Sequence, residues 1–250
     1  MKNQIPKYLT IKQQASKSSE ANMYIDGEIV TDEWYDSDTS ATGFRDALKD
    51  LGDVKTINLH INSPGGSVFE GIAITNMLKQ HSAHVNVYVD GVAASIASVI
   101  AMSGDAIFMP SNSMLMIHNP WAMAVGNANE LRKQADDLDQ IAKASIATYL
   151  AKAGDKLDEG TLKELLDNET WLTAQEAVNY GLADEVIGAN TAAASLNKKF
   201  VQRYRNIPKQ LISEETPKPQ ISDERQRILK TSKAYAEALA EQLKNLKEAY

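Results

Sequence analysis

Apolar and polar residues alternate along several short stretches of the chain and recur at helical spacing in others. The alternating stretches predict strands at residues 24–30, 57–61, 85–89, 106–109, 114–118 and 182–187. Phe44, Leu48 and Leu51 follow helical spacing and are followed by Gly52, which predicts a helix that ends there. A longer apolar stripe predicts a helix over residues 127–152.

Two of these strands are followed by a glycine-containing turn and then a helix. The first turn is Asn62-Ser63-Pro64-Gly65-Gly66, and Ser67 with Glu70 has the form of a capping box that opens the next helix. Gly91 is expected to end the strand at 85–89, before a helix of small residues at about 94–103. Strand, turn and helix in succession predict right-handed βαβ units, and so an α/β fold with a largely parallel sheet.

Two more capping boxes follow the long helix. Thr161 with Glu164 and Thr173 with Glu176 each predict the start of a helix, and the second helix is expected to stop at Gly181.

The composition is that of one globular domain with an appendage: 250 residues, 43% hydrophobic and 24% charged. The absence of cysteine excludes disulfides, thiolate metal ligands and cysteine nucleophiles. Residues 1–20 are polar and aperiodic, which predicts a flexible lead before a domain at residues 21–188. No signal peptide and no apolar run of ~20 residues is found, so a cytoplasmic location is expected.

Charge divides the chain into an acidic body and a basic tail. Residues 189–250 hold 12 Lys and Arg against 7 Asp and Glu, and the remaining 188 residues hold 14 against 26. Three prolines predict a linker at 189–221, and helical spacing predicts an amphipathic helix at 222–250. The acidic body argues against a nucleic-acid binder. The tail is expected to dock on a protein or to self-associate, with a solvated extension as the alternative.

The residues that could carry out chemistry are few. Of the four histidines, His60, His81 and His84 are expected to be structural or solvated. No histidine pair has zinc-helix spacing, and neither a P-loop nor a dinucleotide fingerprint occurs. The sequence therefore predicts no metal site and no cofactor.

Two turns and one histidine are expected to meet at one edge of the sheet. Gly91-Val92-Ala93-Ala94-Ser95 places a serine at the start of a helix, where free backbone N–H groups favour an anion. Taken alone, this turn is more typical of a small-residue helix that packs closely on a neighbour. Gly65 and Gly66 can turn backbone N–H groups toward a ligand in the same way. His118 ends a further strand, so Ser95 and His118 could meet there.

Four sequence blocks together resemble the Clp-type serine peptidase family (ClpP, family S14). The blocks are Ile61-Asn62-Ser63-Pro64-Gly65-Gly66-Ser67, Gly91-Val92-Ala93-Ala94-Ser95, Met116-Ile117-His118-Asn119-Pro120 and Trp171-Leu172-Thr173-Ala174-Gln175-Glu176-Ala177 through Tyr180-Gly181-Leu182-Ala183-Asp184. They occur in the family order and span roughly residues 20–188. The resemblance implies a ClpP/crotonase-type fold of stacked βαβ units. It also implies a homo-oligomeric barrel of one or two rings, whose facing rings are joined by the helix at 127–152.

The resemblance also implies a role for each matching residue. Ser95 is the nucleophile, His118 the general base, and the N–H groups of Gly66 and Ile96 form the oxyanion hole. The third triad member is less clear, because a gap-free match places Glu169 where the family has an aspartate. Glu169 is preferred, and Asp167 is the alternative.

The residues in and around the blocks are similar to those of ClpP-like proteases of phages and prophages. Phage head maturation, in which scaffold or capsid proteins are cleaved within the host cytoplasm or the prohead, is therefore the first predicted role of this serine endopeptidase. The alternative is the proteolytic subunit of an ATP-dependent Clp protease. A distant alternative is a crotonase-fold acyl-CoA enzyme, which needs no serine nucleophile. Polypeptide substrates and a possible scaffold or capsid partner for the tail are the expected partners, without nucleic acid or membrane.

Overall fold

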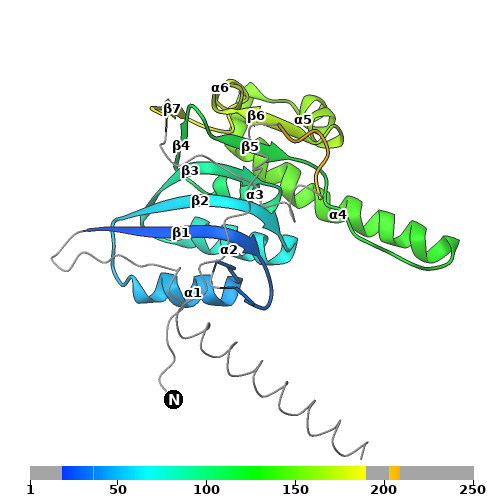
Figure 1. The fold of residues 1–250 in the computed structure, drawn as a ribbon, viewed down its shortest axis with the longest axis horizontal. Helices are drawn as coiled ribbons and strands as arrows, with labels where there is room; N and C mark the ends of the chain where they lie inside the picture. Colours follow the sequence, from blue (N-terminus) through cyan, green and yellow to red (C-terminus); the bar gives the residue numbers. More distant parts are fainter. Residues whose placement is uncertain (1–18, 36, 190–202, 209–250) are drawn as a thin grey trace, which may run out of the picture. The chain divides into compact units, whose positions relative to one another are not determined.

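Seven strands form one sheet, which carries the whole fold of the computed structural model (Figure 1). The structure describes residues 19–35, 37–189 and 203–208. The strands are β1 (Glu20–Ile29), β2 (Thr56–Gly66), β3 (His84–Ala94), β4 (Ala106–Pro110), β5 (Met114–Ile117), β6 (Thr170–Thr173) and β7 (Glu185–Ile187). The main path is β1-β2-β3-β4-β7, all parallel, while β5 pairs in parallel with β3, and β6 pairs antiparallel with β5. The predicted α/β class is confirmed.

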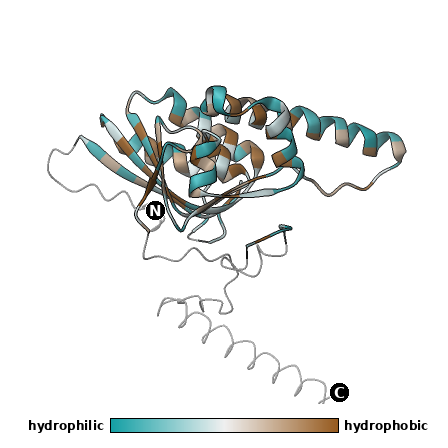
Figure 2. Cartoon of the chain, turned by 90° about the horizontal axis from the view of Figure 1, so that it is seen from above, coloured by the Kyte–Doolittle hydropathy of each residue, from teal (hydrophilic) through white to brown (hydrophobic). Residues whose placement is uncertain are grey.

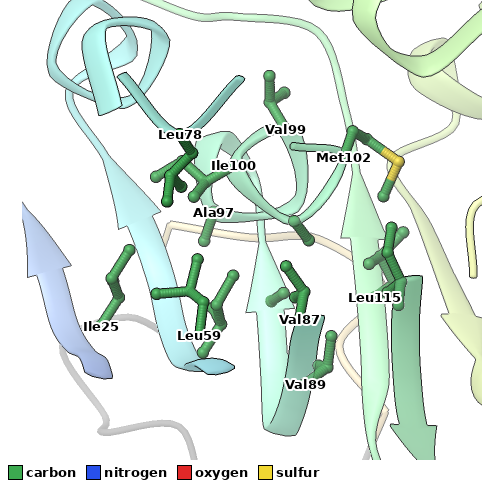
Figure 3. Close-up of a cluster of buried hydrophobic side chains, with 14 of the residues drawn as sticks. Ile25, Leu59, Leu78, Val87, Val89, Ala97, Val99, Ile100, Met102 and Leu115 are labelled. Carbon is green, nitrogen blue, oxygen red and sulfur yellow. The ribbon is translucent and has the colours of Figure 1, made fainter. Parts of the chain in front are cut away.

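The described helices pack on one face of this sheet, as Figure 2 shows from above. They are α1 (Ala41–Asp50), α2 (Val68–Gln80), α3 (Ile96–Ala101), α4 (Ala128–Ala153), α5 (Glu159–Asp167) and α6 (Ala174–Asn179), with a 3₁₀ turn at Gly154–Lys156. Every second residue of β1, β2 and β3 points to the helices. Ile25, Leu59 and Val87 are fully buried there against Leu78 of α2 and Ile100 of α3 (Figure 3).

Of the three capping boxes predicted for the helices, one forms as predicted and two do not. Thr173 and Glu176 form a complete capping box at the start of α6, as predicted. Ser67 is the N-cap of α2, but its side chain makes no cap bond, and the Glu70 carboxylate instead accepts from the N–H of Ala41 at 2.7 Å. The box predicted at Thr161 is wrong: α5 begins earlier, because the Asp158 side chain accepts from the Thr161 N–H and caps the helix.

Both predicted turns after β2 and β3 are strand instead. The stretch predicted as a tight turn at residues 62–66 continues β2, and Gly65 and Gly66 pair with Glu28 and Ile29 of β1 after a shift in register. Gly91 does not break β3, which runs on to Ala94 by pairing with β5. Helix α3 therefore begins at Ile96, later than predicted. Strand pairing with a neighbour, which a local pattern does not report, outweighs the glycine signal.

The other face of the sheet carries no described helix. Tyr24, His60, Tyr88 and Phe108 stack across four strands there, with ring centroids 4.9–5.0 Å apart. The His60 ring also bonds the Asp90 carboxylate at 3.0 Å, so His60 has structural partners, as expected. Parallel sheets are usually covered on both faces, and no described helix covers this one.

Helix α4 extends beyond the sheet that it packs on (Figure 1). Its only buried residues, Ser145, Tyr149 and Ala153, lie in its last three turns. Leu131 in its first turn is 44% exposed, and Met123 and Val125 before the helix are almost fully exposed. No described helix is long and apolar enough to cross a membrane.

Candidate active site

Ser95 lies between the end of β3 and the start of α3, in a backbone conformation that few residues adopt. Its φ of 55° and ψ of −127° lie in a strained region for a non-glycine residue. Its neighbours hold it there: the Ser95 N–H donates to the Met116 carbonyl at 2.9 Å, and the Ser95 carbonyl accepts from the Ser98 hydroxyl at 2.5 Å. The Ser98 hydroxyl is in turn bonded at 2.6 Å to the buried hydroxyl of Tyr149 in α4. The serine is thus fixed by strand, helix and long helix together.

His118 directly follows β5, and the β3–β5 pairing brings it to Ser95. Ala94 pairs with Met116, and the His118 Nε2 lies 2.7 Å from the Ser95 Oγ. Burial lowers the pKa of the imidazole to about 4, with a smaller contribution from the Arg205 guanidinium. The ring is therefore neutral at pH 7. With its proton on Nδ1, Nε2 accepts from the serine hydroxyl, which is the arrangement that a general base needs.

Gly65 and Gly66 run beside Ser95 and Ile96 with no room for a side chain. A Cβ on Gly65 would lie 2.6 Å from the Ala94 carbonyl oxygen and 2.8 Å from the Ser95 Cβ. A Cβ on Gly66 would lie 2.0 Å from the carbonyl oxygen of Ile29 in β1. Their φ values of +86° and +151° also favour glycine. The two backbone segments that hold the expected oxyanion donors, the N–H groups of Gly66 and Ile96, are therefore adjacent.

A cleft of about 390 Å³ opens at this point. Ser95, His118 and Gly66 line it, together with residues 28–31 at the end of β1 and with Arg203 and Tyr204. Its size is that of a small-molecule or peptide side-chain pocket. No group of three or more potential metal ligands occurs in the part of the chain that the structure describes.

The two candidate carboxylates for the third position differ in surroundings. Glu169 is only 8% exposed, with φ at 49°, and its Oε1 has no hydrogen-bond partner among the described residues. Burial raises the pKa of its carboxyl, while the backbone N–H and guanidinium of Arg205 lower it. Asp167 instead accepts from the Asn119 side-chain amide at 2.6 Å in an exposed contact. Among the described residues, no hydrogen bond joins either carboxylate to His118.

Residues 203–208, which sequence reasoning placed in a linker, contact this site. The Tyr204 ring meets the His118 ring edge to face at 5.7 Å and the Trp171 ring at 6.0 Å, and its hydroxyl donates to the Pro64 carbonyl. Arg203 forms an ion pair with Glu28 at the end of β1. Nothing in the local pattern predicts these contacts. The one local signal is Arg203-Tyr204-Arg205, followed by Ile207, which stands out in a polar stretch.

Comparison with known proteins shows which family the chain belongs to. The family model described as Clp protease matches residues 11–190. The chain belongs to the Clp protease family. The resemblance seen in the sequence is thereby confirmed, and the α/β fold is consistent with the ClpP fold that it implied.

Three similar proteins in this family are each named as an ATP-dependent Clp protease proteolytic subunit. Subunit 1 of Protochlamydia amoebophila is 35% identical over 139 residues, or 54% of this chain and 66% of that protein. The subunit of Pleurastrum terricola is 34% identical, over 56% of this chain and 71% of that protein. The subunit of Ligilactobacillus salivarius is 36% identical, over 53% of this chain and 68% of that protein. The matches thus span about two thirds of each relative.

The titration of His118 tests the electrostatics of this site. In ¹H–¹³C NMR, the His118 ring signal, assigned by its loss in His118→Gln, should stay that of the neutral ring from pH 8 down to about pH 5. Arg205→Gln should raise this pKa, because it removes a positive charge. The unfolded chain takes up this proton near pH 6.5 and the folded chain only near 4, so stability should fall as pH falls between these values. A midpoint near 6.5 in the folded protein would contradict the burial of the ring.

Proposed function

We propose that this chain is a serine endopeptidase that acts as a Clp-type proteolytic subunit. The observation that carries the proposal is the 2.7 Å contact between Ser95 Oγ and the neutral Nε2 of His118, at the mouth of a cleft. A serine hydroxyl is a weak nucleophile by itself and needs an adjacent base to attack a peptide carbonyl. The strained backbone at Ser95 supports this role, because such strain clusters at functional sites.

The roles proposed for the neighbouring residues follow from their positions. Ser95 Oγ attacks the scissile carbonyl while His118 Nε2 takes its proton, and the imidazolium then protonates the leaving amine. His118 then takes a proton from water, the water attacks the acyl-enzyme ester, and the imidazolium returns the proton to Ser95 Oγ as the ester bond breaks and the acid product leaves. The N–H groups of Gly66 and Ile96 stabilise the oxyanion, since both lie on backbone that approaches Ser95 closely. This chemistry draws on no metal or nucleotide.

Glu169 is proposed to be the carboxylate that stabilises the imidazolium. It is the buried residue of the turn before β6, and β6 pairs with β5, the strand directly before His118. Its buried Oε1 has no hydrogen-bond partner among the described residues, and we propose His118 Nδ1–H as its donor. Asp167 is the weaker candidate because its carboxylate is exposed and bonded to Asn119.

Assembly into rings is part of the proposal. The sheet face that carries no described helix and the exposed apolar residues along and before α4 are surfaces that a second copy of the chain could bury. The helix at 127–152 was expected to join facing rings, and the position of α4 beyond the sheet supports that expectation (Figure 1).

The relatives favour the second predicted role over the first. Each of the three is named as a proteolytic subunit of an ATP-dependent protease, and none is named for head maturation. Phage head maturation, with a scaffold or capsid partner, stays a prediction from the residues around the sequence blocks. The amphipathic helix predicted at 222–250 as its docking element lies outside the described residues.

Removal of the Ser95 hydroxyl tests the activity. Ser95→Ala should lower the rate of peptide hydrolysis by about 10⁴-fold or more, because the nucleophile is lost. A fluorophosphonate probe should label the parent chain and the control Ser82→Ala, whose serine is exposed and distant from the cleft, but not Ser95→Ala. Equal labelling of Ser95→Ala and the parent would overturn the assignment.

Paired amide substitutions identify the third member. Glu169→Gln should reduce kcat by several orders of magnitude with little change in the free energy of unfolding, because the imidazolium loses its stabilising charge. Asp167→Asn is the matched control and should leave kcat within a few-fold of the parent. A large loss in Asp167→Asn alone would assign Asp167, and no loss in either would leave a Ser–His dyad.

The two roles differ in what the enzyme needs to digest a folded protein. A proteolytic subunit should degrade a folded tagged protein only when a Clp ATPase and ATP are added. A head-maturation protease should instead cleave a co-expressed capsid or scaffold protein without ATP. Ser95→Ala is the control in both assays, and ATP-independent cleavage of a capsid protein alone would reverse the preference.

A further inference from the structure

The 203–208 segment sits on the active site through contacts at both ends and in the middle. Its first residue, Arg203, forms an ion pair with Glu28, and the two side chains are only 31% and 17% exposed. The Asn206 side-chain amide donates to the Asn168 carbonyl at 3.3 Å. In Figure 2 the segment lies on the side of the sheet away from the helices, below the strands.

Tyr204 is the residue that enters the cleft. Its ring covers His118, and its hydroxyl donates to the carbonyl of Pro64, the residue directly before the two glycines. Burial raises the pKa of Tyr204 to about 12, while Arg203 and a hydrogen bond to Ser95 lower it. The phenol therefore stays protonated at pH 7, and its hydrogen bond goes to the Pro64 carbonyl.

An apolar patch anchors the segment. Val92, Ala94 and Met116 are buried on the open face of the sheet, separate from the main core. The partly buried side chains that pack on this patch are those of Met114, Trp171, Tyr204 and Ile207. The segment thus packs on an apolar cluster of this face, which elsewhere carries the aromatic stack, asparagines and the Asp90 carboxylate.

We propose that this cleft is a binding site for a peptide with an aromatic residue between two basic ones, and that Arg203-Tyr204-Arg205 is its resident ligand. This rests on the proposed function and names its substrate class: the segment and substrates with the same pattern compete for the cleft. Glu28 binds the first basic side chain. The surface of His118, Trp171 and the Pro64 carbonyl binds the aromatic one, and Glu169 faces the charge of Arg205.

Competition follows from the groups that the segment engages. An extended substrate that presents its carbonyl to the Gly66 N–H runs past the Pro64 carbonyl, which the Tyr204 hydroxyl takes up. Arg205 also lies beside Glu169, the carboxylate proposed for His118, and lowers the pKa of that carboxyl. A substrate that binds must displace both contacts. If the cleft is empty in only a fraction of the molecules, the apparent affinity of the enzyme for its substrate falls by that fraction.

Full-length variants test the competition. Tyr204→Ala should lower KM for a short fluorogenic peptide about 5-fold or more at unchanged kcat, because the empty cleft becomes the major state. Arg203→Ala should act in the same direction, and Arg45→Ala, an exposed arginine of α1 outside the cleft, should change nothing. A heptapeptide of residues 202–208 should inhibit Tyr204→Ala competitively, and the same peptide with alanine in place of Tyr204 should not.

The outcomes separate this inference from the proposed function. Unchanged KM in Tyr204→Ala together with no inhibition by the heptapeptide would overturn the inference, while labelling of Ser95 would still support the peptidase. A folded Tyr204→Ala with abolished kcat would show that Tyr204 completes the site instead. If no form reacts with fluorophosphonate, the proposed function fails. Polarisation of the fluorescein-labelled heptapeptide then still decides: tighter binding to Tyr204→Ala than to the parent supports the resident ligand, and equal or no binding refutes it.

Discussion

The pairing of the last residues of β3 with β5 is the constraint on which the rest of the site depends. It holds Val92, Ala93 and Ala94 in strand conformation beyond Gly91, so that Ser95 must turn sharply to start α3. The same pairing fixes the end of β5, where His118 follows. The Ser95 N–H bond to the Met116 carbonyl ties the turn to the neighbouring strand. One short stretch of parallel pairing thus sets both the strain at the serine and its distance to the histidine.

The second requirement is that His118 remain an uncharged acceptor. Burial does most of this, and the neighbouring arginine adds to it. The 203–208 segment contributes to that burial, because the Tyr204 ring packs edge to face against the imidazole. If the segment leaves when substrate enters, the substrate takes over the task of excluding water. The Glu169 carboxylate then stabilises the ring more than it does in the resting enzyme, because it balances the positive charge of the imidazolium that forms when Ser95 attacks.

The local pattern predicts the elements well and their edges poorly. Alternation identified β2 and β3, and helical spacing identified α1, and α4 within one residue at each end. Glycines at 65, 66 and 91 suggested turns, but pairing with β1 and β5 makes them strand, and only the tertiary structure supplies those partners. The serine and histidine could be located because the sequence blocks resemble a known family. The contacts of Arg203 and Tyr204 with Glu28, Pro64 and His118 could not, since they join residues more than 80 positions apart through a stretch with no repeating pattern.

Mapping the adduct of a fluorophosphonate probe by mass spectrometry tests the central claim most directly. A second serine, Ser67, lines the same cleft directly after the two glycines and is a possible alternative target for the probe. Only Ser95 has an imidazole nitrogen 2.7 Å from its hydroxyl among the residues that the structure describes. The account predicts a single adduct on the peptide that contains Ser95, formed faster as pH rises through the pKa of His118. An adduct on another serine, or none on the folded full-length chain, would contradict it.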